Sequence, residues 1–142
     1  MTHEFIETLP DDLSQGVIYV SIPYGIVAHK CACGCGNEVI TPLSPTDWRL
    51  TFDGDSITLF PSIGNWNFPC RSHYWIENDE VKWSYQWSDD EIKAGRIQGK
   101  QSKARYYQDQ QEPKEGNLAK ASPPLPRGRL LQLWVTVKKW FS

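Results

Sequence analysis

The chain lacks a long hydrophobic run and carries almost no net charge. No stretch approaches the ~20 consecutive apolar residues that span a bilayer, and residues 1–5 have neither the basic start nor the apolar run of a signal peptide. The 15 basic and 17 acidic residues leave a formal net charge of −2, which gives no electrostatic reason to expect a nucleic-acid partner. We therefore expect a cytoplasmic protein that binds neither membranes nor nucleic acid.

Aromatic residues are abundant where aliphatic residues usually dominate. Hydrophobic residues make up 39% of the 142-residue chain and aromatic residues 13%, including seven tryptophans. This length suits one domain of ordinary size with a core of its own. We expect aromatic rings to fill much of that core.

The four cysteines have the spacing of ligands to one metal ion. Cys31, Cys33 and Cys35 alternate with small residues, and Cys70 stands two residues before Ser72. In a reducing compartment, cysteines favour metal binding or redox chemistry over disulfides. Four thiolates are also the full ligand set of a tetrahedral structural zinc. The sequence therefore predicts a zinc ion held by these four cysteines.

Other interpretations of the cysteines stay open at this point. The Cys-x-Cys-x-Cys spacing differs from the usual Cys-x-x-Cys, so three ligands converge only if glycines bend the chain. His73 could replace one thiolate, the thiols could be buried without a metal, and an iron–sulfur cluster is a lesser alternative because its usual runs are missing. A shell of four protein ligands leaves no position for water, which favours a structural ion over a catalytic one.

The first two thirds of the chain read as short strands. Period-two patterns and turn residues predict two strands within 16–28, one at 38–43, a hairpin of 47–53 with 56–60 that stops at Pro61, and a second hairpin of 72–76 with 81–86. We expect a mostly β, α+β fold whose residues 1–97 form a small zinc-stapled antiparallel β domain. His3 is expected to lie in a mobile terminus.

The last third predicts helices and a polar segment. Ser88 and Glu91 have the spacing of a capping box, which opens a short helix that Gly95 and Gly99 weaken. Residues 98–126 are rich in Gln, Lys and Pro and read as a linker or mobile segment. Residues 127–142 place apolar side chains on one broad stripe and predict an amphipathic C-terminal helix.

Serine and histidine offer a possible nucleophile and base. If a metal occupies the cysteines, His73 is free to act as a base, and Ser62 and Ser72 are the nearest hydroxyls in the sequence. Neighbours in a strand point to opposite faces, so a loop serine at position 62 would face His73 more naturally than Ser72. Asp47 or Asp53 could orient the histidine. His29 is expected to lie at the surface or to support a ligand.

These motifs, taken together, resemble a known family. The set comprises the run His29 to Gly36, then Trp48, the run Leu59 to Trp66, and the run Cys70 to Ile76. It is similar to a family of small bacterial proteins encoded beside genes of ubiquitin-like conjugation, which specify an activating enzyme, a conjugating enzyme and a ubiquitin-like protein. The resemblance covers about residues 15–92 and says little about the rest of the chain.

The resemblance implies a serine-type, deubiquitinase-like peptidase that matures or removes the ubiquitin-like modifier, with Ser62, Ser72 and His73 as the positions to test. Its partner would be the C-terminal peptide of the modifier or its conjugates, paired with an exposed strand edge between walls built from Trp66, Trp75 and Trp83. Backbone N–H groups near Gly64 would hold the oxyanion.

Two other functions compete with the peptidase. One is a non-catalytic zinc-binding module that docks a ubiquitin-like protein or a conjugating enzyme, which the amphipathic C-terminal stripe would suit. The other is a zinc-dependent hydrolase, which requires an open coordination position.

Overall fold

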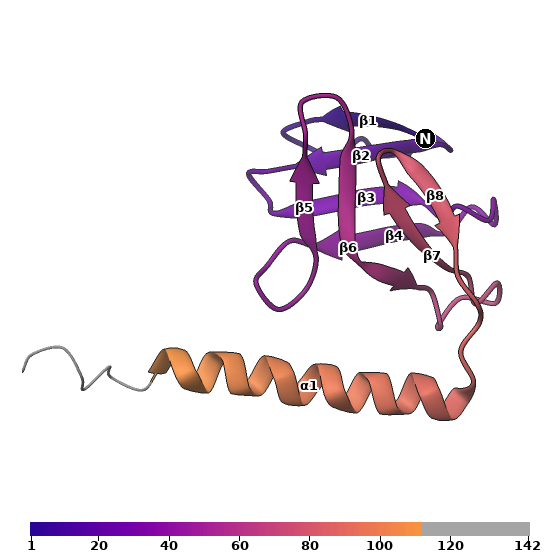
Figure 1. The fold of residues 1–142 in the computed structure, drawn as a ribbon. Helices are drawn as coiled ribbons and strands as arrows, with labels where there is room; N and C mark the ends of the chain where they lie inside the picture. The colour runs from indigo at the N-terminus through magenta and orange to yellow at the C-terminus, as the bar shows by residue number, and fades with distance from the viewer. Residues whose placement is uncertain (112–142) are drawn as a thin grey trace, which may run out of the picture. The chain divides into compact units, whose positions relative to one another are not determined.

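A computed structural model describes residues 1–111 of the chain (Figure 1). The predicted C-terminal helix over 127–142 and the second half of the predicted polar segment lie outside the described residues. The elements in chain order are β1 (Thr2–Phe5), β2 (Val17–Ser21), β3 (Ile26–Lys30), β4 (Glu38–Pro42), β5 (Arg49–Phe52), β6 (Ile57–Gly64), β7 (His73–Glu77), β8 (Glu80–Trp83) and α1 (Asp89–Gln111).

The strands form two sheets of four, in the orders β1-β2-β3-β4 and β5-β6-β7-β8. All neighbouring strands are antiparallel except β1 and β2, which are parallel. The two sheets lie against each other with their strands crossing, and α1 runs along one end of both (Figure 1). The predicted mostly β fold with a following helix is confirmed, as are the two predicted hairpins, which form β5–β6 and β7–β8.

The core lies between the two sheets. Period-two alternation turns every second side chain of each strand inward, and the fully buried residues come from both sheets: Ile18, Val20, Val27, Ile57, Leu59, Tyr74 and Ile76. Tyr74 is the largest buried side chain and most of the others are β-branched. The core is therefore mainly aliphatic, so the expectation that rings fill much of it is wrong. Among residues 1–111, Trp48 packs against this core and is only partly buried.

The N-terminal residues form a strand, so the expected mobile terminus at His3 is wrong. β1 pairs in register with β2 from Thr2 to Phe5. The His3 imidazole Nδ1 lies 2.7 Å from the Asp79 carboxylate, and the terminal amine donates to the Asp79 carbonyl at 2.7 Å. A four-residue strand with charged positions shows no hydrophobic alternation, and it is stabilised by pairing with β2 and by Asp79, which is more than 70 positions away.

β6 is longer than its sequence pattern predicts. The strand was expected to end before Pro61, but it runs to Gly64 and places Ser62 in a strand instead of a loop. Its pairing with β7 shifts between Leu59 and Ile63. This bulge accommodates the proline, which cannot donate to a regular ladder.

The helix begins at the predicted capping box and runs further than expected. Glu91 accepts hydrogen bonds from the Ser88 main chain and side chain at 2.7 and 3.0 Å. α1 then continues to Gln111, through the first half of the segment that reads as a linker. The Gln, Lys, Arg and Ala residues of this half are good helix formers, which explains why a polar composition is helical here. No helix among residues 1–111 is long and apolar enough to cross a membrane.

Polar contacts attach α1 to the strand region along most of its length. Asp89 accepts from Arg71 at 2.8 Å, Arg96 donates to Asn67 at 2.9 Å, and Lys103 reaches Asp47 at 3.2 Å. Each such surface contact contributes less than about 1 kcal/mol, and Ile92 adds the one buried side chain of the helix. Together they fix the face that α1 presents to β5 and β6.

Candidate metal centre and candidate active site

The four cysteines converge at one end of β3. Cys31 directly follows this strand, and the chain then turns through Gly34 and Gly36, whose φ angles of 86° and 84° suit glycine and not larger residues. Cys70 arrives from the loop between β6 and β7. The four Sγ atoms all lie within 4.8 Å of one another. The glycine-permitted bend that the sequence requires is therefore present.

The spacing of the sulfurs fits a tetrahedral metal ion. Three Sγ···Sγ distances are 3.4, 3.9 and 3.9 Å, and a tetrahedron of thiolates about 2.3 Å from zinc has edges of roughly 3.8 Å. Polar groups also point at the sulfurs: Asn37 donates to Cys35 Sγ at 3.3 Å and Asn65 lies 3.6 Å from Cys31 Sγ. The site can therefore hold one metal ion through its four cysteines.

The pKa values of two of the thiols are shifted in opposite directions, as expected when several thiols lie close together. The Asn37 main-chain N–H is the main cause that lowers the pKa of Cys35 to about 7. Desolvation, with the neighbouring thiols, raises the pKa of Cys33 to about 12. Four thiols this close cannot all be ionised without a cation between them, which a bound metal would supply.

His73 lies apart from the cysteine group and pairs with Ser62. Its Nε2 is 2.9 Å from Ser62 Oγ, and its Nδ1 is 2.8 Å from the main-chain oxygen of Tyr85. A carbonyl oxygen only accepts, so Nδ1 carries the proton and donates to Tyr85. Nε2 is then left to accept from the Ser62 hydroxyl, which is the tautomer a general base requires.

Aromatic rings enclose the His73 imidazole, whose residue is only 5% exposed. Trp66 and Trp87 meet its edge at centroid distances of 5.0 and 5.3 Å, and the two indoles stack on each other at 5.5 Å. The pair fits between two glycines, because a Cβ at Gly64 would lie 2.4 Å from Trp66 and one at Gly95 would lie 2.8 Å from Trp87. The imidazole therefore has little freedom to rotate.

Ser72 faces the cysteines and not His73. Its Oγ lies 3.0 Å from Cys31 Sγ and accepts from Asn65 Nδ2 at 3.0 Å, and the residue is 6% exposed. The two neighbours thus point in opposite directions, although β7 begins only at His73. Of the two candidate serines, the structure brings Ser62 to the histidine and Ser72 to the four cysteines.

The aspartates considered for orienting the histidine are engaged elsewhere. Asp47 accepts from Ser44 at 2.6 Å, and Asp53 caps its turn through Ser56. Within residues 1–111, no carboxylate lies within hydrogen-bond distance of His73. The expectation for His29 at the surface is wrong, because it is fully buried and shares a 2.7 Å hydrogen bond with Tyr74.

The residues that sequence reasoning missed are Tyr85 and Trp87. Tyr85 contributes a main-chain atom, so its side chain carries no signal of this role. Both residues were expected to lie in or after a strand ending at 86, but β8 ends at Trp83. The chain stays beside His73 because Ser84 N donates to the His73 carbonyl at 2.9 Å.

The chain was compared with known proteins. The model of the bacterial ubiquitination-like system serine protease family, BubE, matches residues 5–84, which is more than half of the chain. No curated protein and no solved structure matches it. The matched residues include both serines, His73 and all four cysteines, whereas Tyr85, Trp87 and α1 lie beyond them. The chain therefore belongs to the family of serine proteases of bacterial ubiquitination-like systems.

Proposed function

We propose that the protein is a serine-type peptidase that matures a ubiquitin-like protein or removes it from its conjugates in the bacterial cytoplasm. The observation that carries this proposal is the 2.9 Å contact between Ser62 Oγ and His73 Nε2, with Nδ1 bound to the Tyr85 carbonyl. The family's description as serine proteases of ubiquitination-like systems supports the reaction and the class of substrate.

In the proposed reaction, Ser62 Oγ attacks the scissile carbonyl carbon while its proton passes to His73 Nε2. His73 then gives this proton to the departing amine, and an ester joins the substrate to Ser62. A water molecule then attacks the ester carbonyl and passes a proton to His73, the bond to Ser62 Oγ breaks as His73 returns this proton to Oγ, and the product leaves as a carboxylic acid that ionises. The Tyr85 carbonyl holds the imidazole and accepts from Nδ1 throughout, which is the role a carboxylate plays in the usual triad.

The proposed oxyanion donors are main-chain N–H groups next to Ser62. The bulge between Leu59 and Ile63 takes this part of β6 out of regular pairing with β7. Main-chain N–H groups in this irregular stretch would stabilise the negative charge of the tetrahedral intermediate. The Asn65 N–H is not among them, because it donates to the Ser72 carbonyl at 2.8 Å.

We further propose that the cysteines bind zinc and that the ion is structural. Cys31, Cys33, Cys35 and Cys70 would complete its shell, and a closed shell supplies cohesion to the fold and no reactive water. His73 bonds to Ser62 and Tyr85 instead of joining the sulfurs. This arrangement disfavours the zinc-dependent hydrolase.

Two matched variants test the nucleophile. The substrate is a bacterial ubiquitin-like protein extended at its C-terminus by a fluorescent peptide. Ser62→Ala is expected to lower kcat/KM by about 10³-fold or more, whereas Ser72→Ala, which removes the neighbouring hydroxyl, is expected to stay within about tenfold of the wild type. Undiminished cleavage by Ser62→Ala would end this assignment.

The same experiment distinguishes the docking module. If the wild-type chain forms a stable complex with the ubiquitin-like protein but cuts neither the extended precursor nor a conjugate, the peptidase proposal fails and the non-catalytic function is favoured.

A further inference from the structure

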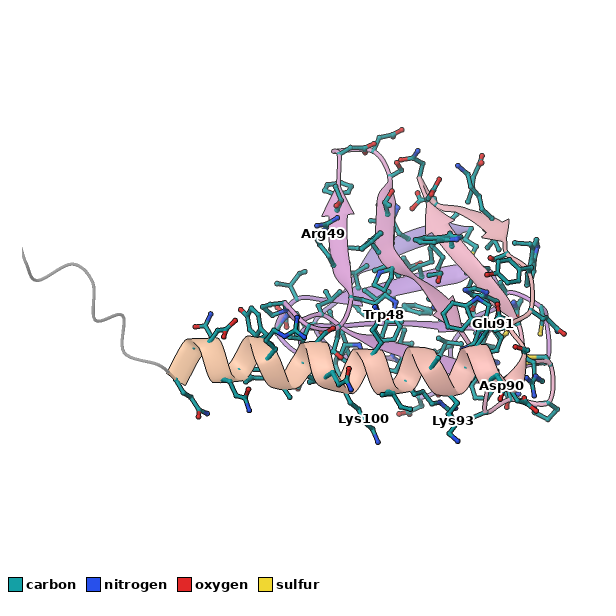
Figure 2. The ribbon with its side chains drawn as sticks, turned by 60° about the horizontal axis from the view of Figure 1, so that its bottom comes forward. Trp48, Arg49, Asp90, Glu91, Lys93 and Lys100 are labelled. Carbon is teal, nitrogen blue, oxygen red and sulfur yellow. The ribbon has the colours of Figure 1, made fainter. Side chains whose placement is uncertain are left out.

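A wide groove lies between α1, the segment 43–50 and the outer face of β6. Its volume is about 1020 Å³, and most of its wall is apolar: Leu43, Trp48, Leu50, Phe60, Pro61 and Trp87. Figure 2 shows Trp48 between the helix and the sheets, whereas Lys93 and Lys100 point away from the opposite side of the helix. The groove thus lies on the inner side of α1.

The groove adjoins the Ser62–His73 pair. Pro61 lines it and is bonded directly to Ser62, and Trp87 lines it and contacts the His73 ring at 5.3 Å. An extended peptide advances about 3.3 Å per residue. A side chain one or two residues from a bond held at Ser62 can therefore reach the groove.

Two glycines shape the helical wall. Gly95 and Gly99 are one turn apart on the same face of α1 and both line the groove. Packing of Trp87 explains Gly95, but a Cβ at Gly99 would meet no heavy atom of the described chain within 4 Å. Glycine costs a helix about 1 kcal/mol relative to alanine. Within residues 1–111, Gly99 has no packing reason, and it leaves open space where a side chain would fill the groove.

The unpaired charge in the groove is positive. The Asp47 carboxylate lines it but is bound by the Ser44 hydroxyl and Lys103, and the Ser44 bond is the first cause that lowers its pKa. Arg49 also lines the groove, with its guanidinium 5.2 Å from the centre of the Phe60 ring. It forms no ion pair with residues 1–111. An occupant that complements this site would carry a carboxylate.

We propose that this groove is the specificity site of the peptidase. It binds a polypeptide substrate through a large apolar side chain within two residues of the scissile bond, and Arg49 pairs with a nearby carboxylate of that substrate. This inference rests on the proposed function, because it takes Ser62 as the nucleophile.

The test introduces a side chain into the groove and the same side chain on the opposite side of the helix. Gly99→Phe fills the groove, and Lys100→Phe is its matched control. A library of unstructured peptides is cleaved and the cut sites are identified by mass spectrometry. Labelling of Ser62 by methanesulfonyl fluoride, which is too small to need the groove, is measured in parallel.

We expect wild-type cut sites to be enriched in Leu, Phe or Met within two residues of the cut. Gly99→Phe should remove this enrichment and lower kcat/KM for such peptides by about tenfold or more, while Ser62 labelling stays unchanged. Lys100→Phe should behave as the wild type in both measurements. The proposal is overturned if the enrichment persists in Gly99→Phe. It is also overturned if the wild type shows no preference for apolar residues, which is the result expected if another segment of this chain fills the groove.

The charge is tested separately with Arg49→Gln. We expect a severalfold rise in KM for peptides with Asp or Glu near the cut, and no change for their amide counterparts. Peptides with a free or an amidated C-terminus show whether the carboxylate belongs to a side chain or to the chain end. Equal loss for charged and neutral peptides would contradict pairing by Arg49. A wild-type chain that neither labels nor cleaves removes the proposed function itself.

Discussion

The cysteine cluster and the Ser62–His73 pair lie on opposite sides of the chain at the start of β7, and they are held in different ways. In the cluster the four sulfurs lie within 4.8 Å of one another, and Ser72 is turned toward them. The pair is held by a main-chain carbonyl and two stacked indoles. Ser72, which directly precedes β7, therefore faces the cysteines, and His73, the first residue of β7, faces Ser62.

This difference teaches that the proposed metal site and the proposed reactive pair can be disturbed independently. Only one peptide bond separates Ser72 from His73, but no hydrogen bond among residues 1–111 joins the sulfur cluster to the imidazole. We expect changes on the cysteine side to act first on stability, and changes on the histidine side to act first on the rate of cleavage.

Loss of the proposed metal is the largest expected effect. Cys70→Ser, or removal of the ion with a strong chelator, should lower the free energy of unfolding by at least about 5 kcal/mol, because binding energy at a structural site is folding energy. Chemical denaturation monitored by tryptophan fluorescence measures the change. If the free energy of unfolding is unchanged after treatment with the chelator, then metal binding by the cysteines does not stabilise the fold.

Removal of the base should have a comparable effect on the rate and little on stability. His73→Gln keeps a planar side chain with polar atoms but cannot take the Ser62 proton, so kcat/KM should fall by about 10³-fold. The free energy of unfolding should stay within about 1 kcal/mol of the wild type. If this variant unfolds as readily as Cys70→Ser, then the two sides of the strand are not separable in the way the structure indicates.

Ser72→Ala tests the boundary between the two regions. The substitution removes the hydroxyl beside Cys31 Sγ and leaves the Asn65 amide without one of its partners. We expect metal affinity to fall by about tenfold, as for other groups that support metal ligands, while the rate per folded molecule changes little. Competition with a chromophoric chelator measures the affinity. A large loss of kcat with unchanged metal binding would place Ser72 in the reaction instead.

The smallest expected effect is at Gly99. Its φ is not in the left-handed region and a Cβ would meet nothing, so Gly99→Ala should stabilise the protein by about 0.5–1 kcal/mol. Thermal unfolding measures the change in stability. Gly95→Ala should instead destabilise the protein, because its methyl group would lie 2.8 Å from Trp87. Equal effects at both positions would contradict the packing described here.

The sequence predicts the metal side of this comparison better than the reactive side. Cysteines have few structural uses in a reducing compartment, so four cysteines near glycines are enough to predict a metal site. The capping box at Ser88 and the period-two strands are local patterns of the same kind. Each is determined by residues close together in the chain, and the structure contains all of them.

The reactive side depends on contacts that leave no local pattern. The Tyr85 carbonyl is a main-chain atom, and any residue there could provide it. Strand β1 forms through parallel pairing and a distant aspartate, and β6 passes through Pro61 only because a bulge accommodates it. Residues 98–111 look like a linker in composition, yet the same residues are good helix formers. Such features follow from tertiary contacts, which sequence patterns do not report.

The central claim is that Ser62 is the activated nucleophile and that His73 activates it. The most direct test treats the full chain with a fluorophosphonate probe and identifies the modified residue by peptide mass spectrometry, in the wild type and in His73→Gln. The account predicts one adduct, on Ser62, that disappears in His73→Gln while Ser72 stays unmodified. An adduct on Ser72, or labelling of Ser62 at the same rate without the imidazole, would contradict it.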